Sequence, residues 1–228
     1  MSEELNIIYE DKNILVCYKR AGLAVQTSKI TETDLEHQVL NYCSKNTKNP
    51  FIGLIHRLDQ PVEGLVLFAK DKKTAGILSN TINAESTGKN YLALVEGKAD
   101  MISGEWANLT DYLLKDGRTN CSKVVAKNTP GAKHASLDYR VLKSGKYKDT
   151  DISLLEIKLH TGRHHQIRVQ LSNAGFPLVG DRKYNPEGLD AGSRFPALCA
   201  YYLSFVHPAS GKLVELECKP QGDLFRLI

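Results

Sequence analysis

Long apolar runs are missing from this chain. None of its 228 residues lies in a hydrophobic stretch long enough to cross a bilayer, and its start, MSEELNIIYEDKN, is acidic where a signal peptide is basic and then apolar. We therefore expect neither a membrane span nor a secretory signal. With 42% apolar and 25% charged residues, the composition is that of a soluble globular protein, which we expect in the cytoplasm.

Cysteine is scarce and poorly placed for metal or redox chemistry. The five cysteines are scattered and include no C-x-x-C pair, so we expect reduced thiols packed as small apolar residues. His160 and His164 have the i, i+4 spacing of a metal site on a helix, but their stretch begins as a strand and no carboxylate or cysteine lies close by. The sequence predicts no metal site.

Charge is only mildly unbalanced, at +4 with a pI of about 8.7, which permits a polyanionic partner without requiring one. Two stretches concentrate the basic residues. The first, at 115–133, reads as a solvated surface. The second, at 158–168, contains alternating histidines and arginines and is harder to explain as surface alone.

Turn signals divide the chain into short elements without repeats or long linkers. We predict a hairpin over 5–10 and 14–19, a helix over about 33–45 behind a capping box at 33–36, and a buried strand at 65–70 followed by a helix capped by Asp71. Further strands are expected at 90–96, 135–142, 152–160, 198–206 and 213–218, and a helix between Gly162 and Gly175. Hairpins dominate, which favours one α+β domain over residues 1–228 with a largely antiparallel mixed sheet.

The most informative segment is the tetrapeptide His56-Arg57-Leu58-Asp59. If this segment is extended, Arg57 and Asp59 point to one side and His56 and Leu58 to the other. A charged pair then faces one cleft, and His56 is a packed histidine.

Three blocks together resemble the signature blocks of the RluA-type RNA pseudouridine synthases: HRLD at 56–59, KNYLALVEG at 89–97 and TGRHHQIRVQL at 161–171. The resemblance runs in the family's order across nearly the whole chain. It implies the pseudouridine synthase fold, with helices and loops flanking the sheet and a catalytic cleft across it. We expect no S4-type RNA-binding domain, because the chain begins directly with catalytic-domain sequence.

The resemblance implies an isomerase that detaches an RNA uridine from its ribose, rotates it and rejoins it through carbon, without a cofactor. Asp59 matches the family's catalytic aspartate. Attack on the sugar, attack on the base and a glycal route all remain open, and each needs an ionised carboxylate. Because burial raises the pKa of a carboxyl group, a fixed cation is expected beside it, and the resemblance assigns this role to Arg168.

The resemblance also assigns roles around the substrate. Tyr91 matches the tyrosine that lies on the target base and takes part in proton transfer at C5. Arg57 matches the arginine that fills the gap left by the flipped uridine; a plain ion pair with Asp59 is the alternative. We expect Arg163 and His164 to contact phosphate, and His165 to orient the turn before the helix on the substrate-binding side.

Two segments depart from the family pattern. The usual Lys-Pro-x-Gly is Lys19-Arg20-Ala21-Gly22, which removes a proline from a loop. After HRLD, the usual Thr-Ser-Gly step is replaced by Gln60-Pro61-Val62-Glu63-Gly64. Losing two hydroxyls and gaining an acid beside an anionic substrate is expected to alter the choice of RNA or to weaken its binding.

Our interpretation is a monomeric enzyme that modifies a stem-loop of ribosomal or transfer RNA, gripped by the catalytic domain itself. An RNA-binding or ribosome-assembly factor with this fold but no chemistry is the alternative. It is disfavoured because a pure binder has no use for a desolvated carboxylate near phosphates. A hydrolase with an aspartate nucleophile is weaker still, because the sequence shows no metal-ligand cluster and no phosphate-binding glycine loop.

Overall fold

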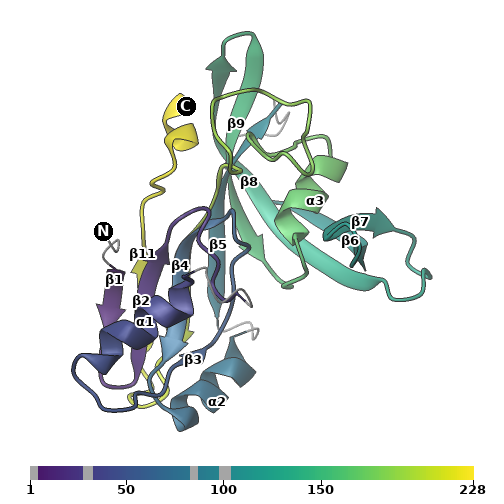
Figure 1. The fold of residues 1–228 in the computed structure, drawn as a ribbon. Coiled ribbons are helices and arrows are strands. Elements are labelled where there is room, and N and C mark those ends of the chain that lie inside the picture. The colour runs from purple at the N-terminus through teal and green to yellow at the C-terminus, as the bar shows by residue number, and fades with distance from the viewer. Residues whose placement is uncertain (1–4, 28–32, 83–86, 98–103) are drawn as a thin grey trace. The chain divides into compact units, whose positions relative to one another are not determined.

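The computed structural model describes residues 5–27, 33–82, 87–97 and 104–228. The chain forms two compact units, and each combines segments that are distant in sequence: residues 1–89 with 200–220, and residues 90–199 with 221–228. Strands outnumber the three α-helices (Figure 1), so the predicted α+β class with a largely antiparallel sheet is confirmed. The single domain over 1–228 and the cleft across the sheet stay predictions. No helix in the described ranges is long and apolar enough to cross a membrane.

The first unit is built around two fully buried strands. Its elements are β1 (Asn6–Glu10), β2 (Ile14–Lys19), α1 (Leu35–Ser44), β3 (Gly53–Leu54), β4 (Glu63–Ala69), α2 (Lys72–Thr81), most of β10 (Leu198–Val206) and β11 (Leu213–Glu217). β2 pairs antiparallel with both β1 and β4, and every residue of β2 and β4 is buried. The predicted hairpin and the predicted buried strand are both confirmed.

Side-chain caps start both helices of this unit. Asp71 caps α2 as predicted, because its carboxylate accepts from the Thr74 backbone N–H at 2.8 Å. The cap of α1 is Asp34, which accepts from the His37 N–H at 2.8 Å, so the helix begins one residue later than the proposed capping box implied.

The second unit holds a five-stranded antiparallel sheet in the order β5-β9-β8-β6-β7. Its elements are β5 (Gly88–Glu96), β6 (Ala107–Asp116), β7 (Cys121–Val125), β8 (Lys133–Tyr147), β9 (Thr150–Leu159), α3 (Gln166–Asn173) and a short 3-10 helix, η1 (Asp223–Leu227). The β6–β7 hairpin was not predicted and runs through the first basic stretch. It lies beside α3 (Figure 1), which packs Val169 against Leu113 and Ala135.

The C-terminus of α3 is set by the predicted glycine. Gly175 adopts φ +87°, a left-handed conformation that favours glycine. Its N–H donates to the Ser172 carbonyl and the Phe176 N–H donates to the Leu171 carbonyl, which is the Schellman pattern. This ending fixes the length of the helix that carries Arg168.

Candidate active-site residues

The HRLD tetrapeptide follows β3 without regular secondary structure, and its side chains alternate as predicted. His56 and Leu58 turn inward: His56 Nε2 accepts from the Leu67 N–H at 3.3 Å, and Leu58 is 7% exposed. Arg57 is exposed and Asp59 is half-buried. The cation and the carboxylate therefore both reach the accessible side of this segment.

The turn after Asp59 is tied to the loop that follows β2. The Gln60 carbonyl accepts from the Gly22 N–H at 2.9 Å, and the Gln60 side-chain amide donates to the Gly22 carbonyl at 3.0 Å. Gly22 has φ +89°, so its left-handed backbone permits this reciprocal pair. This pair of hydrogen bonds, called the Gln60 clamp below, restrains the backbone next to Asp59.

Lys19 completes this clamp, and the sequence analysis missed it. Its ammonium is fully buried and donates to three carbonyls, those of Arg20 at 3.1 Å, Leu23 at 2.8 Å and Gln60 at 3.0 Å. Burial lowers the pKa of Lys19 to about 7, against the opposing pull of the Asp59 and Glu63 carboxylates. Three acceptors fit the three donors of the protonated amine, which places a positive charge near Asp59.

Glu63 does not act as the sequence suggested. Its side chain is buried at 4% exposure and accepts a short hydrogen bond from the Tyr18 hydroxyl. The expectation of an added acid facing the RNA was wrong, because β4 begins at Glu63 and turns its side chain into the first unit.

Arg168 lies in α3 of the second unit and is paired with a residue that the sequence analysis did not identify. Its Nε and Nη2 donate to the two carboxylate oxygens of Asp181, both at 2.7 Å, with side-chain exposures of 4% and 0%. Asp181 Oδ1 also accepts from the backbone N–H groups of Lys183 and Tyr184. Such a bidentate pair fixes the plane of the guanidinium and uses two of its five donors.

Tyr184 connects Arg168 to the start of α3. The Arg168 guanidinium lies over the Tyr184 ring, 5.1 Å from its centroid. The Tyr184 oxygen accepts from the Ser122 N–H at 2.7 Å, and the Tyr184 hydroxyl and His165 Nδ1 are hydrogen-bonded at 2.9 Å. Burial lowers the pKa of His165 to about 3, with Arg168 adding to the shift, so the imidazole is neutral.

The residues before α3 form a tightly bonded turn. His165 adopts φ 54° and ψ 26°, a left-handed backbone that is costly for a non-glycine residue. The Gln166 side chain holds the turn by accepting from the Thr161 hydroxyl at 2.8 Å and the Arg163 N–H at 3.0 Å. The turn is thus shaped by the left-handed backbone of His165 and by the Gln166 side chain, and the orienting role of His165 stays a prediction.

Arg163 and His164 differ in how far their side chains are available to bind an anion. Arg163 is exposed, and its Nε donates to the His134 carbonyl at 2.8 Å. Both ring nitrogens of His164 have protein partners, Ser122 at 2.9 Å and Asn120 at 3.1 Å. Arg163 is thus better placed than His164 to contact an anion.

Tyr91 lies on β5 on the same side as the buried Ala93 and is 8% exposed. It pairs across the sheet with Ile157, which belongs to the apolar face of β9. Asn90 points to the opposite face and donates to Glu156 at 3.0 Å. Tyr91 is therefore a buried aromatic residue with its backbone fixed by the sheet.

The three signature blocks fall within one region of similarity to known proteins. The RNA pseudouridylate synthase family matches residues 13–173, which is more than half of the chain. The chain belongs to this family. As an RNA pseudouridylate synthase it is an isomerase that converts uridine in RNA to pseudouridine. Asp59, Tyr91 and Arg168 lie inside the matched region, whereas Asp181 and Tyr184 lie beyond it.

Curated relatives support the same family. An uncharacterized RNA pseudouridine synthase of Bacillus subtilis is 32% identical over 233 residues, covering 99% of this chain and 72% of that protein. The ribosomal large subunit pseudouridine synthase D of Nitrosomonas europaea is 33% identical over 232 residues, covering 98% of this chain and 64% of that protein. The chain thus spans about two thirds of the length of these relatives.

A solved structure supports the fold. The human RNA pseudouridylate synthase domain containing 1 superposes with a TM-score of 0.76 at 27% identity, covering 99% of this chain and 87% of that one. The pseudouridine synthase fold expected from the three blocks is therefore confirmed.

Proposed function

We propose that this synthase modifies a uridine in a stem-loop of ribosomal or transfer RNA, with Asp59 as the catalytic carboxylate and with base flipping. Family membership and a similarity to relatives named for the ribosomal large subunit support an RNA of this kind. We further propose that the enzyme works as a cytoplasmic monomer without metal or cofactor.

The assignment of Asp59 is supported by the accessibility of its side of the tetrapeptide and by the hydrogen bonds that fix the next turn. The tetrapeptide exposes Asp59 and Arg57 on one side, while Lys19, Gly22 and Gln60 fix the turn that follows. In its protonated form the buried Lys19 amine favours the ionised carboxylate in every mechanism open to the enzyme. In the net reaction the C1′–N1 bond breaks, the C1′–C5 bond forms, C5 loses its proton and N1 gains one.

Arg168 is proposed as the further cation that keeps Asp59 ionised. Its guanidinium is oriented by Asp181 and lies over Tyr184, so it is preorganised before substrate arrives. Asp181 is accordingly a positioning residue, which acts through Arg168.

Tyr91 is proposed to stack on the target base and to take part in the proton transfer at C5. Its position on a paired strand fixes the backbone that carries the ring, and its phenol supplies one polar group. Stacking on aromatic rings is the usual way in which proteins hold unpaired RNA bases.

Arg57 is proposed to fill the gap that the uridine leaves, because an exposed planar cation can recover part of the stacking lost on flipping. Arg163 is proposed to contact phosphate. His164 and His165 are assigned to holding the turn before α3, since their ring nitrogens bond to the protein.

The test is to map pseudouridine in ribosomal and transfer RNA from cells with and without this protein. We expect one or more uridines to lose modification and to regain it when the wild-type chain is restored. An identical map in both cells would contradict the proposed substrate class.

A further inference from the structure

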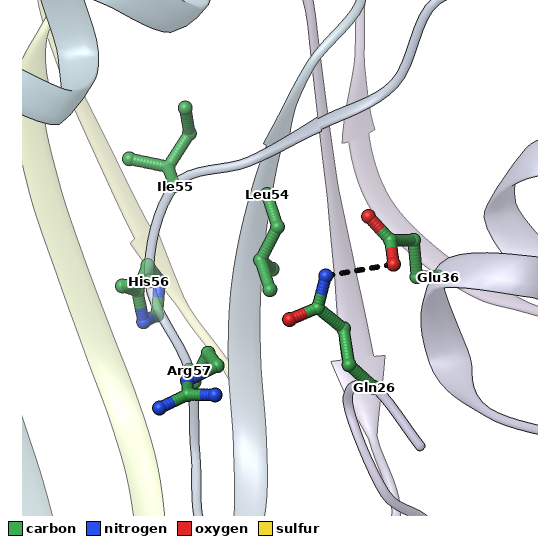
Figure 2. A pocket seen from close by; sticks show the side chains of 6 residues that line it. All are labelled: Gln26, Glu36, Leu54, Ile55, His56 and Arg57. Atoms are coloured by element: carbon green, nitrogen blue, oxygen red, sulfur yellow. Dashed lines mark hydrogen bonds between the residues drawn. The ribbon is translucent and has the colours of Figure 1, made fainter. Parts of the chain in front are cut away.

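Two exposed arginines, Arg57 and Arg163, are proposed above to contact the RNA, and their surroundings differ. Arg57 borders a pocket of about 440 Å³ in the first unit, which Figure 2 shows with the residues that line it: Gln26, Glu36, Leu54, Ile55, His56 and Arg57. In its polar wall the Gln26 amide donates to Glu36 Oε2 at 2.8 Å (Figure 2). Because Glu36 adds a negative charge, this wall does not extend a surface for RNA beyond Arg57 itself.

Arg163 belongs to the second unit, whose sheet has one covered face and one open face. On the covered face, Ala135 packs against Val169 of α3. Tyr91 lies on this face as well, because it pairs with Ile157, which pairs with Tyr139. The open face is formed by alternate residues of β6, β8 and β9 whose side chains are half-buried or exposed, among them Asn108, Tyr112, His134, Asp138, Arg140 and Lys158.

Aromatic rings and cations gather at the end of the open face that adjoins Arg163. The rings of Tyr112 and His134 meet edge to face, with their centroids 5.7 Å apart. The exposed Lys127 ammonium lies 6.0 Å from the centroid of the Tyr112 ring. Arg163 Nε donates to the His134 carbonyl at 2.8 Å, so the arginine proposed to contact phosphate lies next to these rings.

A second group of this kind lies farther along the same face. Trp106 directly precedes β6 and is 37% exposed, so part of its indole remains accessible. The Arg140 guanidinium lies 4.8 Å and the Lys158 ammonium 4.2 Å from the centroid of its ring. The largest aromatic side chain of the face is therefore flanked by two positive charges.

The acids of the open face have protein partners. Asp138 accepts from the Asn108 amide at 2.8 Å and is bonded to His160 at 2.8 Å. Glu156 is 5% exposed and accepts from Arg140 Nε at 2.7 Å. The accessible charge of this face is therefore set by its exposed lysines and is positive.

We propose that the open face binds a single-stranded segment of the RNA substrate, with bases stacked on its aromatic rings and phosphates held by its cations. Proteins hold single strands by this combination of rings and positive charge. About 20 Å of strand separates Trp106 from Tyr112, a length that spans several nucleotides. Tyr91 and α3 lie on the covered face, so the open face takes a segment beside the target uridine. Arg163, in the turn before α3, connects the two sides through its bond to β8.

This inference rests on the proposed function and adds a second RNA contact to it. The first test titrates the full chain with an oligocytidine of about ten residues, a length within the site sizes of single-strand modules. Oligocytidine contains no uridine, so it cannot react. Trp106 is the single tryptophan of the chain, so its fluorescence reports on the open face. We expect saturable quenching of this fluorescence.

Tyr112 variants show whether a stacked base contributes to this binding. Tyr112→Ala should weaken the affinity for oligocytidine at least about fivefold, the effect of losing one base stacked on an aromatic ring. Tyr112→Phe keeps the ring and should keep the affinity. Fluorescence that does not respond to oligocytidine, or equal affinity in Tyr112→Ala and the wild type, would overturn the inference. Fluorescence that responds only to protein concentration would assign the face to a second copy of the chain and would overturn it too.

Lys158 tests the phosphate contacts by the salt dependence of the same binding. Lys158→Gln should reduce the slope of log affinity against log salt concentration by about 0.7, the contribution of one phosphate in a single strand. Lys146→Gln is the matched control, because Lys146 is an exposed lysine near the end of β8 and should leave the slope unchanged. Equal slopes in both variants would refute the role of Lys158.

The RNA substrate separates this inference from the proposed function. Once a target uridine is mapped, Tyr112→Ala should raise KM for that RNA at least about fivefold, whereas Lys146→Gln should leave KM unchanged. Pseudouridine formation with equal KM in Tyr112→Ala and the wild type would refute the open face alone. Binding of oligocytidine on the open face without any pseudouridine formation by the wild type would instead refute the proposed function.

Discussion

Replacing Asp181 with asparagine tests the claim that the second unit is built to hold Arg168. The change removes the charge that neutralises a guanidinium of 4% side-chain exposure. Asparagine keeps one carbonyl oxygen for the backbone N–H groups of Lys183 and Tyr184, so the turn itself retains an acceptor. The main loss is the charge pair and one of its two hydrogen bonds.

The size of the effect follows from the burial of the pair. Breaking a buried ion pair by removing one partner costs about 3–5 kcal/mol, and we expect Asp181→Asn to lie near 3 kcal/mol because one acceptor remains. The exposed pair Arg226–Asp223, at 80% and 87% exposure, gives a matched control: Asp223→Asn should change stability by less than about 1 kcal/mol.

Urea denaturation followed by fluorescence measures both changes. The chain has a single tryptophan, Trp106, which lies in the second unit and reports on it directly. The double variant Arg168→Met/Asp181→Asn removes the stranded charge and should recover at least half of the loss. A cost for Asp181→Asn no larger than that of the control, or a double variant less stable than the single one, would refute this reasoning.

Three further changes probe other parts of the structure. Gly64→Ala should cost more than about 3 kcal/mol, since the added Cβ clashes with the Ala200 carbonyl oxygen and φ is +128°. At Gly76 an added Cβ meets nothing within 4 Å, so Gly76→Ala should stabilise α2 by about 0.5–1 kcal/mol in thermal or urea unfolding. The folded protein holds His165 neutral down to pH about 3, so the unfolded chain binds more protons below pH 6.5 and the stability of the wild type falls on acidification. Between pH 6.5 and 4 the His165→Asn variant should lose about 2 kcal/mol less stability than the wild type. An equal loss of stability in both would contradict the assignment. Arg57→Ala should leave the unfolding curve unchanged and raise KM for RNA, so an unchanged KM would argue against its stacking role.

Local signals were sufficient to predict much of the fold. The hairpin β1–β2, the buried strand β4 and the Asp71 cap each depend on residues that are neighbours in sequence. The alternation within HRLD was predictable for the same reason, because two-residue periodicity survives in an extended loop.

The β6–β7 hairpin could not be recognised in this way. Its strands carry Lys115 and Lys123, and apart from Leu113 and Ser122 their residues are half-buried or exposed, so the stretch resembles a solvated surface. Pairing with β8 defines β6 as a strand, and that partner is distant in sequence.

The residues that hold Arg168 and the Gln60 turn, Asp181 and Lys19, could not be predicted from the sequence because their roles depend on tertiary contacts. Asp181 lies 13 residues after Arg168 in a loop, and no local pattern links a loop acid to a helix arginine. Lys19 looked like a loop charge, yet its burial among three carbonyls follows from the way the Gln60 turn meets the loop after β2. The cation expected beside Asp59 was assigned to Arg168, and the additional cation Lys19 could be recognised only in the structure.

The central claim is that Asp59 performs the chemistry on uridine. The most direct measurement is pseudouridine formation by Asp59→Asn on RNA from cells that lack the enzyme, with RNA binding and the unfolding curve measured on the same protein. We predict normal binding and stability with no pseudouridine formed. Turnover by Asp59→Asn at the wild-type rate would contradict the assignment of Asp59 as the catalytic carboxylate.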